Sequence, residues 1–325
     1  MKRIIIYAII VFLALVITLA IIFSQKNDEE GKLKTIKVSE VTHSPFYTPL
    51  YVAIEKGYFE ERGLNIDLIL TSGANNVTAA VLSGDVEIGF CGPEATIYVY
   101  NEGKKDYVTT FAGLTKRDGQ FIISRSKIEN FTMQDLENKE VIAGRAGGMP
   151  IINFINAIKN AKIENVKVND SVDFANLTSA FLSGEGDFVN LFEPNATKIE
   201  NMGYGYVVAS VGKHSGEVPY TAFNAKKSYI NNNIDDINNF RIALNKGLDF
   251  THNNKSEDIA KTIIKQFPDT SLNELVKIVN RYKEADSWLK DTTITEKMFK
   301  NLEDMMIDSG FIKSYVPFKD LIINE

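Results

Sequence analysis

Two glutamates lie beside prolines in short phrases that could carry chemistry: Glu94 in "GFCGPEA" and Glu193 in "LFEPNA". A carboxylate shielded from water can act as a general acid or base, or it can accept hydrogen bonds from the amino groups of a ligand. A glutamate at the start of a helix is more often a solvated charge, which is the default interpretation for Glu94. Glu193 is therefore the stronger candidate for a buried acceptor.

The other reactive side chains are few and scattered. Cys91 is the only cysteine, which excludes an internal disulfide and a multi-cysteine metal site, and it is either a ligand contact or a small buried hydrophobe. His43, His214 and His252 do not have the spacing of metal ligands, so we expect neither a metal nor a cofactor. Of the three histidines, only His43 falls in a loop that we expect to line a site.

Several loops contain small residues at which a ligand can approach the main chain closely. Gly73, Gly92, Gly147 and Gly148 have no Cβ, and the free N–H groups of a helix that starts beside them can hold an anion without a basic side chain. Tyr47 offers a ring with a polar tip, which suits a half-buried site, whereas Phe46 beside it should face the core. The remaining candidate ligand contacts in these loops are Ser44, Ala74, Asn75 and Met149.

These candidates fall in a pattern that occurs twice. Residues 76–96 read as a helix that ends in Ser-Gly, a buried strand and a Pro-started helix, and residues 176–197 repeat this order. Alternating strands and helices joined by short turns predict parallel sheets covered by helices. The repeat therefore predicts an α/β protein with two similar lobes.

Two such lobes place the carboxyl ends of their strands at a shared edge, where ligands bind in open α/β sheets. We expect six loops to meet there, at residues 42–47, 71–76 and 91–95 of the first lobe and 145–150, 170–176 and 192–196 of the second. The sequence thus predicts a ligand site in a cleft between the lobes.

Composition and the N-terminus narrow the class of protein. The chain has 325 residues, 44% of them hydrophobic, and a net charge of −6 without a long basic run, so it lacks the electrostatic footprint of a nucleic-acid-binding protein. Residues 1–23 combine two basic residues with an apolar run long enough to span a bilayer. We expect an uncleaved membrane anchor, or alternatively a cleaved signal peptide, then a tether at 24–34 and a remainder outside the cytoplasm.

Several phrases resemble one family: "PLYVAIEKGYFEERGLNIDLI", "AAVLSGDVEIGF", "RAGGMP", "FLSGEGDFVNLFEP" and "RYKEADSWLK". They are similar to the ABC-importer substrate-binding proteins of the nitrate/sulfonate/taurine and thiamine-pyrimidine-precursor group, over residues 35 to 320. The resemblance implies a periplasmic-binding-protein fold that closes on a small molecule, and a monomer that serves permease and ATPase subunits. The family usually has a lipobox cysteine or a cleaved signal, and this sequence has neither clearly.

On this interpretation, residues 35–126 and 219–325 form the first lobe, with the C-terminal helices packed on it, and residues 127–218 form the second. We expect the chain to cross between the lobes near Ile123–Asn130 and to return near Glu217–Ala222. These two connections would form a hinge whose open and closed states a ligand shifts.

The loops offer two carboxylate acceptors and only Arg145 as an obvious cation. We therefore favour a flat, donor-bearing ligand such as an aminopyrimidine, stacked near Tyr47 and hydrogen-bonded to Glu193, with a simple sulfonate second. Two other classes stay open. One is an enzyme like the fungal thiamine-pyrimidine synthases, although these carry a cysteine-rich run where this chain has Cys91 alone. The other is an extracellular sensor, which would have to signal through a partner.

Overall fold

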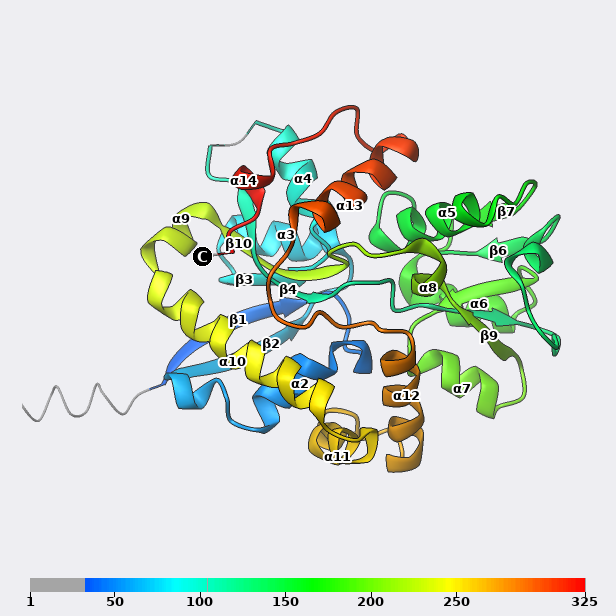
Figure 1. Ribbon diagram of the computed structural model, residues 1–325, viewed down its shortest axis with the longest axis horizontal. Coiled ribbons are helices and arrows are strands. Elements are labelled where there is room, and N and C mark those ends of the chain that lie inside the picture. Colours follow the sequence, from blue (N-terminus) through cyan, green and yellow to red (C-terminus); the bar gives the residue numbers. More distant parts are fainter. Residues whose placement is uncertain (1–32, 104, 325) are drawn as a thin grey trace, which may run out of the picture.

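The computed structural model describes residues 33–103 and 105–324, which form two lobes, each built on a five-stranded sheet with flanking helices (Figure 1). The first sheet has the strand order β2 (Leu64–Leu70), β1 (Lys34–Glu40), β3 (Ile88–Cys91), β10 (Thr221–Lys226), β4 (Val108–Thr115). The second has the order β7 (Lys167–Asn169), β6 (Glu140–Ile142), β8 (Phe188–Leu191), β5 (Phe121–Ser124), β9 (Tyr206–Ser210). The two orders correspond strand by strand, which confirms the prediction of two similar α/β lobes.

Both sheets are mixed, so the prediction of parallel sheets was wrong. β1 runs parallel to β2 and β3, and β6 runs parallel to β7 and β8. β10 is antiparallel to β3 and β4, and β5 is antiparallel to β8 and β9. β5 and β10 are the strands that follow each passage between the lobes. They enter their sheets at the edge where the parallel strands end, so they must run in the opposite direction.

The repeated phrase folds as expected in both lobes. The helix, strand and helix of the first copy are α3 (Ala74–Ser83), β3 and α4 (Glu94–Asn101), and those of the second are α6 (Leu177–Leu182), β8 and α7 (Asn195–Asn201). Gly84 ends α3 in the left-handed conformation, with φ 88°, which glycine adopts without strain. Pro93 and Pro194 stand at the N-caps of α4 and α7, so Glu94 is the first residue of its helix.

The remaining helices cover the sheets and join the lobes. The second lobe also contains α5 (Met149–Ala161) and α8 (Val211–Ser215), and the first contains α2 (Thr48–Glu55), α9 (Lys227–Asn232), α10 (Ile234–Asn253), α11 (Ser256–Ile263) and α14 (Phe318–Leu321). Helix α12 (Leu272–Glu284) packs on α11 and on the 3-10 turn η1 (Pro45–Tyr47), and α13 (Glu296–Asp308) contacts α5. The C-terminal helices were expected on the first lobe alone. Figure 1 shows that α12 and α13 reach the boundary with the second lobe.

Residues 116–120 and 216–220 carry the chain between the two sheets. The two segments run side by side, and the Val218 N–H donates to the Lys116 carbonyl at 3.0 Å. The return matches the position expected near Glu217–Ala222. The first crossing, expected at Ile123–Asn130, lies earlier in the chain because Ile123 already belongs to β5 of the second sheet.

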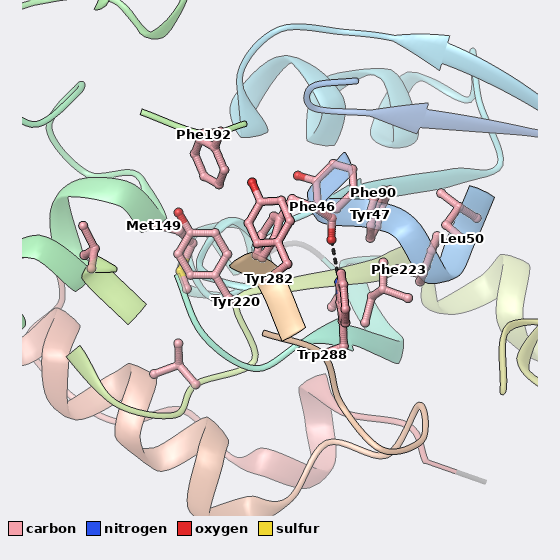
Figure 2. Packing of buried hydrophobic residues seen from close by; sticks show 14 of the residues in the cluster. Phe46, Tyr47, Leu50, Phe90, Met149, Phe192, Tyr220, Phe223, Tyr282 and Trp288 are labelled. Carbon is pink, nitrogen blue, oxygen red and sulfur yellow. Dashed lines mark hydrogen bonds between the residues drawn. The ribbon is translucent and has the colours of Figure 1, made fainter. Parts of the chain in front are cut away.

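Aromatic side chains form the core beneath the lobe boundary (Figure 2). Phe90 of β3 stacks on Phe223 of β10 with ring centroids 4.2 Å apart. The Trp288 indole N–H donates to the Phe46 carbonyl at 2.7 Å, and the Phe46 ring lies 5.2 Å from that of Tyr282. This packing holds η1 in place, and with it the candidate residue Tyr47.

Within the part of the chain that the structure describes, no helix is long and apolar enough to cross a membrane. The expected membrane segment at residues 1–23 and most of the tether at 24–34 lie outside the described residues.

Candidate functional site

A cavity of about 750 Å³ lies between the lobes. Its volume is within the range of roughly 300–1,000 Å³ that is typical of small-molecule sites. All six loops expected to meet at this edge contribute to its wall, and three of them lead directly into helices α3, α4 and α5. The prediction of a cleft built from these loops is confirmed.

The cavity brings together most of the residues that the sequence singled out. Those that line it are Tyr47, Gly73, Ala74, Asn75, Gly92, Glu94, Gly147, Gly148 and Met149. Four others do not line it: His43, Ser44, Cys91 and Glu193. The structure shows what engages each of these four.

Glu94 is the most unusual of the lining residues. It is only 2% exposed, and its Oε2 has no hydrogen-bond partner among the residues that the structure describes. Burial raises the pKa of this carboxyl group to about 7, although the backbone N–H groups of Glu94, Met149 and Ala95 act in the opposite direction. The default interpretation of Glu94 as a solvated charge was therefore wrong.

Gly92 lets the two lobes approach each other beside Glu94. A Cβ at this position would lie 2.0 Å from Glu94 Oε2 and 2.4 Å from Cγ of Met149, which belongs to the other lobe. Two hydrogen bonds also cross the cavity: Tyr98 Oη donates to the Gly147 carbonyl, and Arg145 Nη2 donates to Asn75 Oδ1, each at 3.0 Å. The lobes are thus closed around the cavity.

Aromatic rings supply much of the remaining wall. Tyr47 is 2% exposed and packs edge-on against Phe90, with centroids 4.4 Å apart, while Phe46 faces the core as expected. Phe192 joins the wall from the second lobe and Tyr220 from the returning crossing segment. Figure 2 shows Phe192, Tyr220 and Tyr47 arranged around one region at the lobe boundary. Burial raises the pKa of the Tyr47 and Tyr220 phenols well above the usual value, so both keep their protons.

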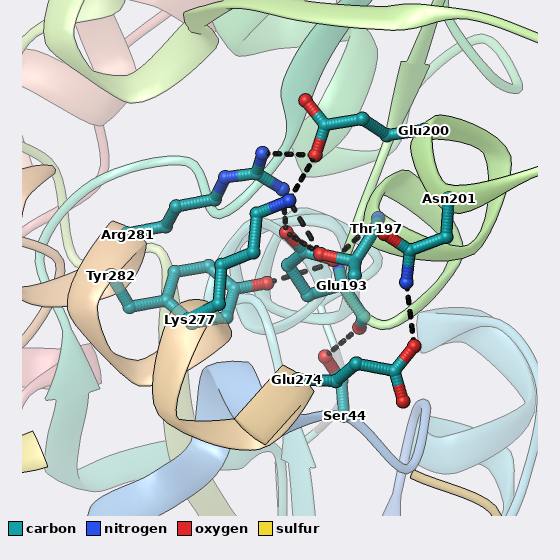
Figure 3. Close-up of polar contacts among 9 residues, drawn as sticks. All are labelled: Ser44, Glu193, Thr197, Glu200, Asn201, Glu274, Lys277, Arg281 and Tyr282. Atoms are coloured by element: carbon teal, nitrogen blue, oxygen red, sulfur yellow. Dashed lines mark hydrogen bonds and ion pairs between the residues drawn. The ribbon is translucent and has the colours of Figure 1, made fainter. Parts of the chain in front are cut away.

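Glu193 has a structural role at the lobe boundary rather than a place in the cavity (Figure 3). Its Oε1 accepts from Arg281 Nη1 at 2.7 Å and from Thr197 Oγ1 at 2.9 Å, and its Oε2 accepts from the Thr197 N–H at 2.8 Å. Arg281 Nη2 also donates to Glu200 Oε2 at 2.6 Å, which extends the link between α12 and α7. Its carboxylate is already engaged by Arg281 and Thr197, so the structure does not support the expected hydrogen bond from a ligand to Glu193.

The other three residues outside the cavity wall are also engaged. His43 Nδ1 and Nε2 pair with Glu40 Oε1 at 2.7 Å and with the Gln266 carbonyl at 2.9 Å. Ser44 Oγ donates to the Glu193 carbonyl at 2.6 Å, across the lobe boundary. Cys91 is 1% exposed, and burial raises the pKa of its thiol, so the alternative of a small buried hydrophobe describes it best.

Several residues of the cavity wall were not predicted from the sequence. Tyr98 stands four residues after Glu94 on α4, so helical periodicity alone could have placed both on one face. Phe174 and Phe192 also line the cavity. They lie in loops expected to meet at the cleft, but they are not among the residues predicted to contact a ligand. Tyr220 ends the returning segment and Thr221 begins β10, and only knowledge that the chain passes the cavity here could have identified them.

A second buried carboxyl group lies in the first crossing segment. Asp118 is fully buried, and its Oδ1 accepts from the Gln120 N–H at 2.6 Å. Burial raises the pKa of Asp118 to about 8.

The raised pKa values of Glu94 and Asp118 predict how the free energy of unfolding depends on pH. The ordinary pKa values of Glu94 and Asp118 are 4.5 and 3.8, so between about pH 4 and pH 8 the folded state binds more protons than the unfolded chain. We expect the free energy of unfolding to fall as the pH rises from 5 to 8, by about 2–3 kcal/mol for Glu94 alone. Urea unfolding of the wild type, Glu94→Gln and Asp118→Asn measures this, and each variant should flatten the profile. Stability that rises over this range would contradict the assignment.

Comparison with known proteins agrees with this architecture. Residues 44–258 match the family model described as NMT1/THI5 like. The chain is 39% identical over 300 residues to "Putative binding protein YtlA" of Bacillus subtilis (strain 168), a match that covers 91% of this chain and 90% of YtlA. A shorter match, 32% identical over 84 residues, links 25% of this chain to 24% of the 4-amino-5-hydroxymethyl-2-methylpyrimidine phosphate synthase of Aspergillus parasiticus. The chain belongs to the NMT1/THI5-like family.

Solved structures share the fold at low sequence identity. The alkanesulfonate-binding protein SsuA from Xanthomonas axonopodis pv. citri has a TM-score of 0.71 at 13% identity, covering 90% of this chain and 99% of its own. A ligand-binding component of an ABC-type import system from Staphylococcus aureus has a TM-score of 0.70 at 11% identity, covering 90% and 97%. The two lobes therefore adopt the α/β fold of periplasmic binding proteins.

Proposed function

We propose that this protein is the extracytoplasmic substrate-binding component of an ABC importer. It captures a small organic molecule in the interlobe cavity and delivers it to permease and ATPase subunits. Its membership of the NMT1/THI5-like family and its similarity to YtlA along most of both chains support this role. The single observation that carries the proposal is the closed cavity between the lobes, which has the size of a small-molecule site.

We propose that the ligand contacts come from the nine predicted residues in the wall, together with the aromatic side chains that the sequence missed. Rings from both lobes favour a flat ligand, because stacked or edge-on contacts need large planar surfaces. An aminopyrimidine or a related vitamin precursor remains the favoured ligand, and a simple sulfonate remains second. We propose that Glu94, whose carboxyl group lies in the wall, accepts the hydrogen bond from the ligand in place of Glu193.

The two other classes have less support. The similarity to the pyrimidine phosphate synthase covers a quarter of the chain. The thiol of Cys91, the residue that takes the place of the cysteine-rich run of those enzymes, is buried outside the cavity wall. Binding without catalysis is therefore the role that we propose, ahead of an enzyme or a sensor.

The proposed role places the lobes outside the cytoplasm. We propose that residues 1–23 anchor a monomeric protein to the membrane, and secretion after cleavage is the alternative. N-terminal sequencing of the membrane fraction tests this: a mature protein that begins between Ser24 and Lys34 would favour secretion.

A thermal-shift panel of pyrimidines, thiamine fragments, flavins, sulfonates and nitrate tests the proposed function. At least one compound should stabilise the wild type and bind with one-site stoichiometry in calorimetry. Ser72→Trp, which fills the cavity from an exposed wall position, should weaken binding by about tenfold or more. Ser83→Trp is the matched control, because this exposed serine at the end of α3 is not part of the wall. Equal binding by both variants would place the site elsewhere, and no binding by the wild type would contradict the proposal.

A further inference from the structure

We infer that the cavity selects a ligand with a cationic or proton-donating nitrogen and rejects simple anions, because Glu94 places a carboxylate of the chain itself where two helix N-termini meet. This inference rests on the proposed function and narrows its ligand class. It decides between the two ligand types that the family resemblance left open.

Two helices direct their N-termini at the same point of the cavity. Helix α4 begins at Glu94 and α5 begins at Met149, and both first residues line the wall. Neither helix has a hydrogen bond from the side chain of its N-cap residue. Such ends carry partial positive charge and free N–H groups, which commonly hold an anionic ligand. In the absence of any other feature, this geometry would favour a sulfonate or a nitrate.

The side chain of Glu94 changes that expectation. The backbone N–H groups that stabilise its ionised form belong to Glu94 and Ala95 of one helix and to Met149 of the other. The side chains of Glu94 and Met149 also approach each other over Gly92, where an ideal Cβ would lie 2.0 Å from Glu94 Oε2 and 2.4 Å from Met149 Cγ. A carboxylate of the protein therefore occupies the position that a ligand anion would take, and an incoming anion would meet a like charge.

One oxygen of the same carboxyl group lacks a hydrogen-bond partner among the described residues. Its Oε2 is buried without a hydrogen bond from any residue that the structure describes, and such a group is costly unless a donor pairs with it. The ionisable groups near Glu94 are Tyr47, Cys91, Tyr98 and Tyr220. Tyrosine and cysteine side chains never carry a positive charge, and burial raises the pKa of each of these groups, so all four stay neutral near pH 7. A nitrogen donor from the ligand would complete the pair.

The other charged side chains in the cavity wall also favour a cationic ligand. Asp173 adds negative charge, and Arg145 is the one basic side chain among the described wall residues. Arg145 Nη2 donates to Asn75 Oδ1 at 3.0 Å, which ties this guanidinium to the opposite lobe. The field in the cavity therefore favours a cation over an anion.

Calorimetry with flat probes of opposite charge tests the inference: benzamidine and 4-aminopyrimidine against benzenesulfonate. The wild type should bind at least one nitrogen-donor probe and not the sulfonate. Glu94→Gln keeps the shape but removes the charge, so it should bind that donor probe about 30-fold more weakly or worse and should gain affinity for benzenesulfonate. Glu164→Gln, an exposed position outside the cavity, makes the same chemical change and should behave as the wild type.

The pH dependence of the wild type gives a second measurement that does not depend on the folding of a variant. Benzamidine stays cationic, so its affinity should rise about tenfold from pH 6 to pH 8 as Glu94 ionises. Benzenesulfonate binding to the wild type as tightly as to Glu94→Gln, or an affinity for benzamidine that does not change with pH, would overturn the charge selection and leave ligand capture intact. Failure of the wild type and of Glu94→Gln to bind any probe, together with a thermal-shift panel without a hit, would overturn both proposals.

Discussion

Glu193→Ala is expected to lower the free energy of unfolding by about 3 kcal/mol, because it removes one partner of a buried ion pair. The Glu193 side chain is fully buried, and that of Arg281 is 16% exposed. The substitution would leave the guanidinium with Glu200 as its one ionic partner and with the Thr197 hydroxyl oxygen as an acceptor. It would also take the acceptor from the Thr197 N–H and hydroxyl groups (Figure 3). Urea unfolding followed by circular dichroism measures the change.

Glu200→Ala is the matched control for this prediction. Glu200 lies on α7, the helix that follows Glu193, and pairs with Arg281 and Lys277, but its side chain is 25% exposed. Water screens a partly exposed pair, so we expect a loss of about 1 kcal/mol. If Glu193→Ala kept its stability but lost ligand affinity, Glu193 would return to the ligand site and the structural role described above would be wrong.

Gly92→Val is expected to hold the lobes apart and to weaken ligand binding by about tenfold or more. Any side chain at this position would overlap Glu94 Oε2 and Met149 Cγ, which lie 2.0 and 2.4 Å from an ideal Cβ. Because Met149 belongs to the other lobe, separation of the lobes relieves the overlap with Met149, whereas the Glu94 side chain can move away within its own lobe. Small-angle scattering should show a larger radius of gyration for the ligand-free variant than for the wild type.

The control for the radius alone is Gly148→Ala, on the opposite side of the cavity. An ideal Cβ there lies 3.6 Å from Pro150 Cδ and 3.8 Å from the Arg145 carbonyl oxygen, which are ordinary contacts, and φ is −93°. We expect its ligand-free radius to match that of the wild type. A folded Gly92→Val protein with an unchanged radius would show that this contact does not govern closure.

The repeated phrase predicted the two lobes, and the strand ends expected in two such lobes predicted the six loops of the cavity wall. The repeat also distinguishes the two glutamates. When the copies are aligned on Pro93 and Pro194, Glu94 corresponds to Asn195 and Glu193 to Gly92. The two glutamates therefore lie on opposite sides of the aligned prolines: Glu94 follows Pro93, and Glu193 precedes Pro194. Only Glu94 is the first residue of a helix.

Other features depend on contacts between segments that are distant in the sequence. Arg281 pairs with Glu193 only because α12 lies beside α7, and no local pattern in either helix indicates this contact. The directions of β5 and β10 follow from where the chain passes between the lobes. Periodicity identifies these segments as strands but does not show from which edge they enter a sheet.

A crystal structure of the wild-type protein with the strongest ligand from the thermal-shift panel tests the central claim most directly. We expect one molecule in the interlobe cavity, with its ring beside Tyr47 and a nitrogen donor about 2.6–3.2 Å from the Glu94 carboxylate. A ligand bound outside this cavity, or one that places an anionic group against Glu94, would contradict it.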